Sequence, residues 1–199
     1  MLRPILLPAL LLVAGFGTLR AQVNYYARVG AVAAGTLLRD RLGGEITVRQ
    51  DVAPLLALGA SLPISPGYRA GLEATVSSGG FDADQGGAET DLGTLRTASL
   101  LLDLEGPVWR TLRWRAGLGG LMYRPAEESG IFLQGGPIRF LAGVGADWRE
   151  PVSSGWDLMI SGRYDFHRFT TDELELRGFS QAQGVSRVSL SVGLARGLR

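Results

Sequence analysis

Two adjoining segments of alternating hydrophobicity, residues 138–149 and 156–167, constrain the fold of this chain more than any other feature. In both, every second residue is apolar or small, and most of the residues between are small or polar and include charges such as Arg139 and Asp147. A turn containing proline and glycine, residues 150–155, separates them. Alternation with period two indicates a strand with chemically different faces, and two such runs around a turn predict a β-hairpin.

The length of these segments points to a membrane. Each alternates over about ten residues, whereas strands of soluble domains usually have about five or six. A strand that crosses a bilayer needs about 9–11 residues. The apolar face carries no charge in either segment, and Trp148 and Trp156 meet at the turn, where an interfacial aromatic belt would lie. The sequence therefore predicts that this hairpin is one quarter of a small transmembrane β-barrel.

Six further alternating segments complete the pattern. They cover residues 25–36, 52–62, 68–76, 95–104, 112–122 and 187–194. The connections alternate between short turns and long loops, the long ones being 37–51, 78–93, 124–137 and 169–184. The predicted fold is all-β, an eight-stranded antiparallel up-and-down transmembrane β-barrel with short periplasmic turns and longer external loops. One alternative stays open in the first loop, where residues 45–52 could extend the second strand.

The amino-terminal residues have the features of an export signal. Arg3 supplies a positive charge, residues 5–16 are apolar, and Ala21 is a small residue at a cleavage position. We predict a signal peptide at 1–21 and an outer-membrane barrel domain at 22–199. A membrane anchor is the alternative, but the apolar run is short for a spanning helix.

Composition narrows the functional classes. The 199 residues contain no cysteine, which excludes disulfides and a lipoprotein acyl site, and the net charge of +1 does not suggest nucleic acid as a partner. The mature chain has no run of about 18 apolar residues, so a helical membrane protein is not expected.

Aromatic residues lie near the ends of the predicted strands, where girdles at the two membrane interfaces would be. The tryptophans are at the short-turn ends, and the other three residues are near the long loops. The predicted membrane-interface aromatics are Trp109, Trp114, Trp148, Trp156, Tyr123, Tyr164 and Phe166.

Strand number, loop alternation and girdles together resemble the small eight-stranded outer-membrane barrels of the OmpX and OmpA transmembrane-domain type. The resemblance covers the mature chain and implies a location in the cell outer membrane and a monomeric state. It also implies outer-membrane lipid, lipopolysaccharide and the outer-membrane assembly machinery as partners. Barrels of this family usually end in an aromatic residue that this machinery reads, whereas this sequence ends at Arg199.

The polar faces of the strands predict the contents of the barrel. Eight strands enclose a space that side chains fill, and glycines on the same faces leave room for long side chains. We therefore predict a hydrogen-bonded charged plug with a stabilising role and no open pore. The predicted lumen network is Arg28, Arg69, Glu73, Asp103, Arg113, Arg115, Arg139, Asp147, Asp157, Arg163, Asp165 and Arg187.

The sequence leaves the direction of the two faces open. A secreted soluble ligand-binding β-barrel would place the apolar faces inside. The membrane interpretation places them outside, where an arginine at the bilayer midplane would cost about 2–4 kcal/mol. The absence of charge from these faces favours the membrane interpretation.

Candidate chemistry is sparse. His167, the single histidine, stands at a loop end, as in an outer-membrane lipid-modifying hydrolase such as a lipid A deacylase, but the His-x-Ser pair of such enzymes is absent. Residues 82–93 begin like a calcium loop, yet the twelfth position is Gly93 instead of an acid. We predict no catalytic residues, metal or cofactor, and a structural or surface-interaction role. The hydrolase and the soluble barrel are the alternatives.

Overall fold

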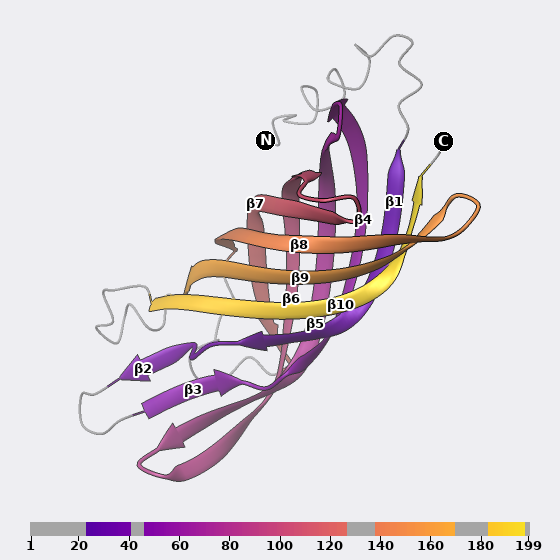
Figure 1. The fold of residues 1–199 in the computed structure, drawn as a ribbon. Coiled ribbons are helices and arrows are strands. Elements are labelled where there is room, and N and C mark those ends of the chain that lie inside the picture. The colour runs from indigo at the N-terminus through magenta and orange to yellow at the C-terminus, as the bar shows by residue number, and fades with distance from the viewer. Residues whose placement is uncertain (1–22, 41–45, 127–137, 170–182, 198–199) are drawn as a thin grey trace, which may run out of the picture.

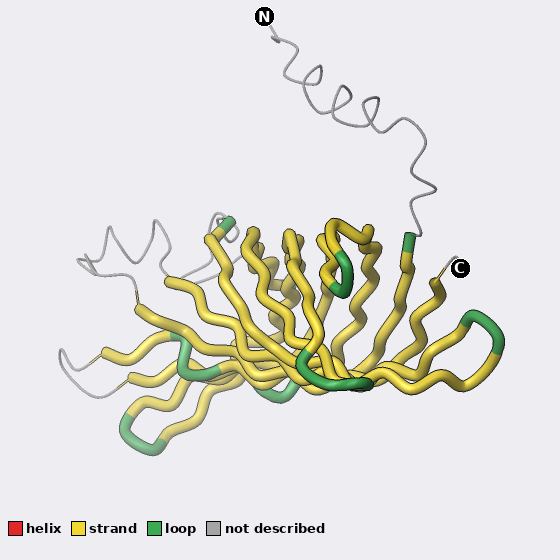
Figure 2. The backbone as a smooth tube through the Cα atoms, turned by 45° about the horizontal axis from the view of Figure 1, so that its top comes forward, coloured by secondary structure: helices red, strands yellow, loops and turns green. Residues whose placement is uncertain are grey.

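The computed structural model describes residues 23–40, 46–126, 138–169 and 183–197. Figure 2 shows these residues as strands joined by short loops. No helix in the described part of the chain has the length and apolar character needed to cross a membrane. The strands are β1 (Asn24–Ala34), β2 (Leu38–Asp40), β3 (Ile46–Gln50), β4 (Ala53–Ser65), β5 (Tyr68–Gln85), β6 (Ala88–Pro107), β7 (Leu112–Pro125), β8 (Arg139–Ser153), β9 (Trp156–Phe169) and β10 (Gln183–Gly197).

Eight of these strands close into a ring. Its order is β1, β4, β5, β6, β7, β8, β9 and β10, and β10 pairs back with β1. All of these pairings are antiparallel. In Figure 1, β8, β9 and β10 of one wall run across β4, β5 and β6 of the other, as expected because barrel strands tilt by about 35–45°. The predicted eight-stranded antiparallel barrel is confirmed.

The two ends of the ring differ in how the strands are connected. At one end, Asn24 of β1 lies opposite Gly197 of β10, and the tight turns at 66–67, 108–111 and 154–155 join successive strands. Gly67 and Gly155 have φ of 81° and 83°, a region that glycine enters without steric cost. We call this the short-turn end and the opposite end the long-loop end.

The prediction of a long polar loop at residues 78–93 is wrong. β5 continues to Gln85 and β6 begins at Ala88, so the two strands pair up to a two-residue turn. Gly86 and Gly87 have φ of 59° and 89°, and hairpin turns of type I′ require positive φ at both central residues. Polar composition suggested a loop, but the buried Phe81 gives this extension an apolar side to pack.

A short hairpin follows β1 and joins this extension. β2 pairs with β3, and β3 pairs with the far part of β5. Figure 1 shows β2 and β3 beside the projecting β5–β6 hairpin. The open alternative is that residues 45–52 extend the second strand. Residues 46–50 do form a strand that pairs with β5, as β4 does, but it is separate from β4. β3 ends at Gln50, β4 begins at Ala53, and between them the Asp51 N–H donates to the Gly80 carbonyl at 3.0 Å.

The apolar faces of the barrel strands point outward. In β6, Leu100 and Leu102 are 58% and 64% exposed, whereas Leu101 between them is 1% exposed. Exposed apolar side chains of this kind recur on every strand of the ring, and they form a belt far larger than the apolar patches that soluble proteins expose. The alternative of a soluble ligand-binding barrel required the opposite orientation and is wrong.

Tyr123 does not lie on the outer surface with the other predicted interface aromatics. It is 1% exposed and lies inside the barrel, because it follows the outward-facing Met122 and the alternation turns it inward. Its placement in a girdle is therefore wrong. The other six have outward or turn positions: Trp109, Trp114, Trp148, Trp156, Tyr164 and Phe166.

Candidate functional site: the barrel lumen

Glu73 of β5 is the centre of a buried ionic network inside the barrel. It is 1% exposed, and its Oε2 accepts hydrogen bonds from the Tyr26 hydroxyl at 2.9 Å, from Arg115 Nη2 at 2.8 Å and from Arg28 Nη2. Arg163 Nη1 lies 3.5 Å from its other oxygen. Three guanidinium groups from β1, β7 and β9 thus surround one carboxylate, which links β5 to three other strands across the lumen.

Two aspartates share these arginines. Asp103 accepts hydrogen bonds from Arg115 at 2.8 Å and from Arg163 at 3.1 Å. Asp165 accepts one from Arg163 Nε at 2.6 Å. Hydrogen bonds between ionised groups are shorter and stronger than neutral ones. The arginines therefore link neighbouring carboxylates into one network instead of isolated pairs.

Asp147 of β8 closes the network on the remaining side. It is fully buried and accepts a hydrogen bond from the Ser161 hydroxyl at 2.6 Å. Its carboxylate oxygens lie 3.6 Å from Arg115 and 3.8 Å from Arg28. Buried charges are tolerated in proteins when they are paired and hydrogen-bonded, as they are here.

A second ionic cluster lies nearer the short-turn end, around Glu105 of β6. Arg149 Nη2 donates to its carboxylate at 2.5 Å, and the Nε atoms of Arg69 and Arg113 lie 3.5 and 3.7 Å away. Arg113 also donates to the Gly67 carbonyl at 2.5 Å. Glu105 and Arg149 were not among the predicted lumen residues, although both continue the inward-facing parity of their strands.

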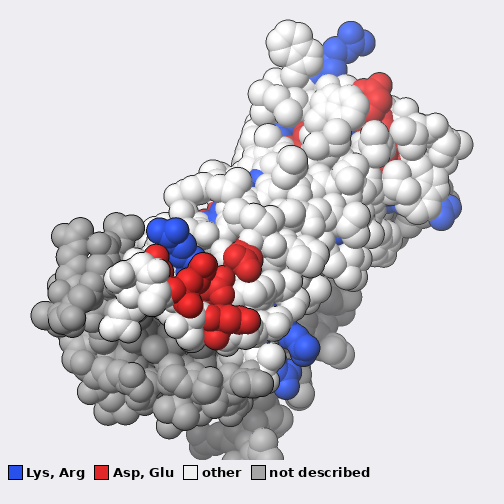
Figure 3. Space-filling view, turned by 90° about the horizontal axis from the view of Figure 1, so that it is seen from below, with Lys and Arg blue, Asp and Glu red and all other residues white. Residues whose placement is uncertain are grey.

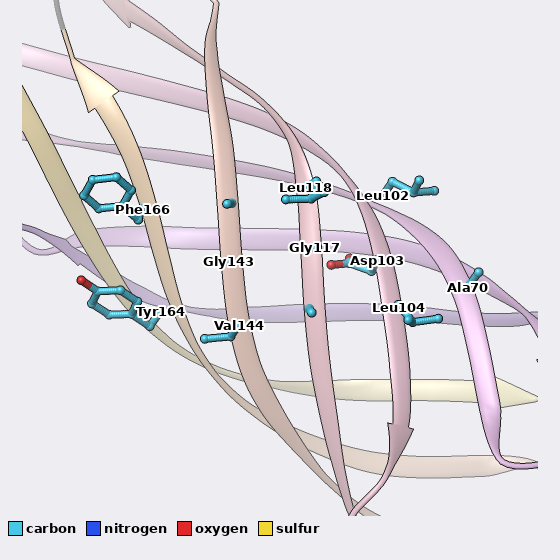
Figure 4. Close-up of a pocket in the computed structure, with 12 residues that line it drawn as sticks. Ala70, Leu102, Asp103, Leu104, Gly117, Leu118, Gly143, Val144, Tyr164 and Phe166 are labelled. Carbon is cyan, nitrogen blue, oxygen red and sulfur yellow. The ribbon is translucent and has the colours of Figure 1, made fainter. Parts of the chain in front are cut away.

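Glycines make space for these side chains. A Cβ at Gly117 would overlap the Asp103 carboxylate, and a Cβ at Gly143 would overlap that of Asp165. Figure 4 shows the Asp103 carboxylate directed toward Gly117 on the neighbouring strand. Each added Cβ would also come within about 3 Å of Arg163, at 2.8 and 2.9 Å from its Nη2. The glycines are therefore needed for the network to fit.

The outer surface of the same wall is hollowed. A depression of about 650 Å³ has small residues such as Ala116 and Ala142 among its lining, with Leu118, Tyr164 and Phe166 around them. Its lining is mostly apolar and it is open to one side. It lacks the convergent polar groups that orient a small ligand in a binding site.

The long-loop half of the lumen is filled differently, by an apolar cluster. Its members come from inward positions of the barrel strands, from β3 and from the segment between β1 and β2. They are all at most 4% exposed, so solvent does not reach their side chains at this level of the interior. The residues are Leu37, Val48, Phe81, Leu95, Leu101, Leu121, Tyr123, Leu141, Phe169 and Val185.

His167 lies at the edge of this apolar cluster. It is 1% exposed, and its Nε2 is 2.6 Å from the Tyr123 hydroxyl. Tyr123 in turn packs edge-to-face on Phe169, with ring centroids 5.2 Å apart. In the described residues no serine is hydrogen-bonded to His167, and its Nδ1 has no partner. Among the residues that the structure describes, no nucleophile or orienting acid of a hydrolase is hydrogen-bonded to this histidine.

Arg187 of β10 lies between the ionic network and the apolar cluster. Its Nη2 donates to the hydroxyls of Ser77 at 3.2 Å and Thr97 at 3.0 Å. These two hydroxyls also lie 2.7 Å from each other. Among the described residues no carboxylate lies within ion-pair distance of Arg187, which distinguishes it from the arginines around Glu73.

The structure places the remaining predicted lumen residues at the edges of the network. Arg139 begins β8 at the long-loop end, opposite Leu121. Asp157 is at the short-turn end of β9, opposite Ala195, and forms no ion pair with any described residue. Tyr26, which binds Glu73, was missed from the sequence. The signal was present, because Tyr26 shares the parity of Arg28.

Carboxylates gather on the β5–β6 extension, outside the lumen. Asp82 lies directly opposite Asp91, and Asp84 opposite Glu89. Figure 3 shows acidic side chains grouped at this end of the molecule. Within residues 23–40, 46–126, 138–169 and 183–197, no group of three His, Cys, Asp or Glu side chains is arranged to hold a metal ion. The extension is therefore an acidic surface.

Solved structures share this arrangement of a closed eight-stranded ring. Neisserial surface protein A has a TM-score of 0.58 at 12% identity, covering 87% of this chain and 96% of its own. The fold is that of the small outer-membrane β-barrels. The outer-membrane protein AlkL aligns with a TM-score of 0.52 at 13% identity, covering 93% of this chain and 94% of its own. OprG from Pseudomonas aeruginosa aligns with a TM-score of 0.52 at 12% identity, covering 90% and 97%.

Sequence comparison adds no closer relationship. No protein-family model matches the chain, and no curated protein matches it. The resemblance to small eight-stranded outer-membrane barrels that the strand pattern predicted is confirmed at the level of fold. At identities of 12–13%, the shared outer-membrane barrel fold carries over no ligand or activity.

Proposed function

We propose that this chain is an outer-membrane barrel with a closed lumen and a structural or surface-interaction role. The observation that carries the proposal is how little space the lumen retains. Beside Glu73, Arg163 and Arg187, the cavity has a volume of about 20 Å³. That is about the room that one water molecule needs, so the ionic network leaves no path for ions or solutes.

The apolar cluster at the long-loop end supports the same conclusion independently. Leu95, Leu121 and Leu141 are at most 1% exposed, and they fill the lumen above the ionic network. An ion crossing this layer would lose its hydration without gaining polar partners. The barrel is thus closed by two successive layers of different chemistry.

The membrane location of the proposal rests on the outer belt. Strands whose outer faces are apolar between the two ends of the barrel, around a charged interior, are stable only where lipid replaces water around them. The predicted signal peptide at 1–21 lies outside the described residues and belongs to the proposal. In the outer membrane the short turns would face the periplasm, and the acidic β5–β6 extension would face outward as the surface for contacts.

Fractionation tests the location. The expressed full-length chain is expected in the outer membrane and should migrate differently on gels with and without boiling, because a closed barrel resists unfolding by detergent at room temperature. A product that stays in the soluble periplasmic fraction would contradict the membrane proposal.

Planar-bilayer recording tests the closed lumen. We expect no conductance steps from the refolded wild-type chain, and none from a variant with only Glu73 and Arg163 replaced by alanine, because the apolar layer remains. A variant that also carries Leu121→Gly and Leu141→Gly is expected to conduct. Conductance from the wild type would contradict the closed lumen, and unboiled gel mobility verifies that each variant is folded.

A further inference from the structure

Two arginines stand side by side on the outer surface of the barrel near the long-loop end. Arg96 of β6 is the direct cross-strand partner of Arg124 of β7, and on its other side Arg96 pairs with Ser78 of β5. All three are exposed and have the parity of the outward-facing apolar residues. They form a polar row, Ser78–Arg96–Arg124, across three neighbouring strands.

This row is electrostatically incomplete. Directly opposed residues have Cβ atoms about 4.5–5.5 Å apart, and like charges at that separation destabilise a sheet. In the described part of the chain, neither Arg96 nor Arg124 forms an ion pair or a side-chain hydrogen bond. All the arginines around Glu73 and Glu105, by contrast, have carboxylate partners. Within the described residues, the pair on the outer surface therefore lacks an anion that would complete it.

An apolar groove begins directly below the polar row. The next row toward the short-turn end consists of direct cross-strand partners, Met122, Ala98, Val76, Leu56 and Val29. These residues line a groove of about 520 Å³, and Arg96, Arg124 and Ser78 line it too. Ala98 is the smallest side chain of the row and lies between Met122 and Val76, which lowers the floor of the groove.

The depth of the polar row matches a membrane interface. Gly106 of β6 pairs with Trp114 near the short-turn end, and Arg96 lies ten residues from it along the same strand. At about 3.3 Å per residue and a tilt of about 40°, this is about 25 Å along the barrel axis. The apolar band of outer-membrane barrels is about 25 Å tall. The arginines are therefore at the level of lipid headgroups and the groove at the level of acyl chains.

We propose that this groove binds a phosphate-bearing lipid of the surrounding leaflet. The phosphate accepts hydrogen bonds from Arg96, Arg124 and Ser78, and an acyl chain lies along Ala98 and Val76. Arginine is suited to this role because its planar fork of donors matches two phosphate oxygens. The inference rests on the proposed membrane location and specifies the lipid partner that the family resemblance implies only as a class.

Lipid retention tests the proposal. The full chain is refolded in phosphatidylcholine nanodiscs that contain a few per cent of bis-phosphorylated lipid A. The protein is then released from the nanodiscs, and the lipid A that stays bound to it is quantified by native mass spectrometry. We expect Arg96→Gln combined with Arg124→Gln to lower retention at least about tenfold. Ala98→Leu, which raises the groove floor without changing charge, is expected to lower retention about threefold.

Arg168→Gln is the matched control. Arg168 is an exposed arginine with the outward parity of β9, also at the long-loop end, and it does not line the groove. We expect its retention to stay within about twofold of wild type. An equal loss in Arg168→Gln would show diffuse attraction to a basic rim and overturn the site, as would unchanged retention in the double variant. Displacement of lipid A by millimolar inorganic phosphate would also overturn it, because the acyl chain would then contribute nothing.

Each failure is separable from failure of the proposed function. Gel mobility without boiling and bilayer recordings report the closed barrel, and none of these outer-surface substitutions touches the lumen. A folded, non-conducting barrel without selective lipid retention overturns only the lipid site. A barrel that retains lipid A but conducts overturns only the closed lumen.

Discussion

The two halves of the lumen are closed by opposite chemistry. Toward the short-turn end, Glu73 and its neighbours form an ionic network in which each buried charge has a partner. Toward the long-loop end, Leu95, Leu121 and Phe169 fill the same tube with hydrocarbon. The barrel wall is continuous through both halves, so the difference resides in the inward-facing side chains alone.

The two halves should respond differently to substitutions. Removing one partner from a buried ion pair leaves the other charge buried and unpaired, which costs more than the pair itself contributes. Removing a buried apolar side chain costs transfer free energy plus a cavity term and leaves no unpaired charge. The ionic half should therefore be the more sensitive to single substitutions.

Glu73→Ala is expected to have the largest effect. It removes the carboxylate shared by Arg28, Arg115 and Arg163, and the free energy of unfolding should fall by about 3–5 kcal/mol. Urea titration of the detergent-refolded chain, read by gel mobility, measures the change. Glu89→Ala on the exposed extension is the control and should change stability by less than about 0.5 kcal/mol. Equal effects at the two positions would refute the ionic core.

Leu121→Ala should destabilise the apolar half by about 2–4 kcal/mol, because Leu121 is fully buried in the cluster. The matched control is Leu118→Ala on the same strand, where the side chain is 57% exposed toward lipid. The same titration gives both values. A loss at Leu118 as large as that at Leu121 would mean that the cluster does not close the lumen.

Gly117→Ala should cost about 1–3 kcal/mol, because the new Cβ overlaps the Asp103 carboxylate and displaces it from Arg163. Gly162→Ala is the control, since a Cβ there meets nothing within 4 Å. Thermal unfolding in detergent compares the two. If Gly117→Ala proved as stable as wild type, the network would have room for the added methyl group, which the structure does not indicate.

Tyr123→Phe should have the smallest effect, about 1 kcal/mol, because it removes one hydrogen bond to His167 and keeps the ring packed on Phe169. Tyr164→Phe, on the outward face, serves as the control and should be nearly neutral. Urea midpoints measured side by side test the difference. A larger loss at Tyr164 would contradict the burial of Tyr123.

The sequence predicts the ionic half far better than the apolar half, for a physical reason. An arginine such as Arg115 on a strand of apolar alternation has one tolerable place, the lumen, so its parity assigns it. Leu101 and Leu141 share that parity but are apolar, and an apolar residue is acceptable on either face of a membrane barrel. Their joint burial depends on the register of the strands, because the register decides which residues lie at the same height in the lumen. The alternation of a single strand does not reveal this register.

The prediction of a polar loop at residues 78–93 is wrong for a related reason. Asp82, Asp84 and the two glycines of the β5–β6 turn have the composition of a solvated loop. What keeps this segment extended is its pairing with β3 and the burial of Phe81. Both are long-range contacts, whereas composition reports only local preference. Tyr123 was misplaced because it was assigned by residue type, although the parity of β7 gives its direction correctly.

The distribution of Glu73's partners over the chain has a consequence for assembly. Its carboxylate is held by residues from β1, β7 and β9, which are about 40 to 90 positions away in sequence. Before β1, β7 and β9 surround it, Glu73 of an inserted β4–β5 hairpin would be an uncompensated charge on the face opposite the lipid, a cost that only the assembled ring removes. Closure and charge pairing must therefore occur together, and partly inserted intermediates are selected against by the same residues that later seal the barrel.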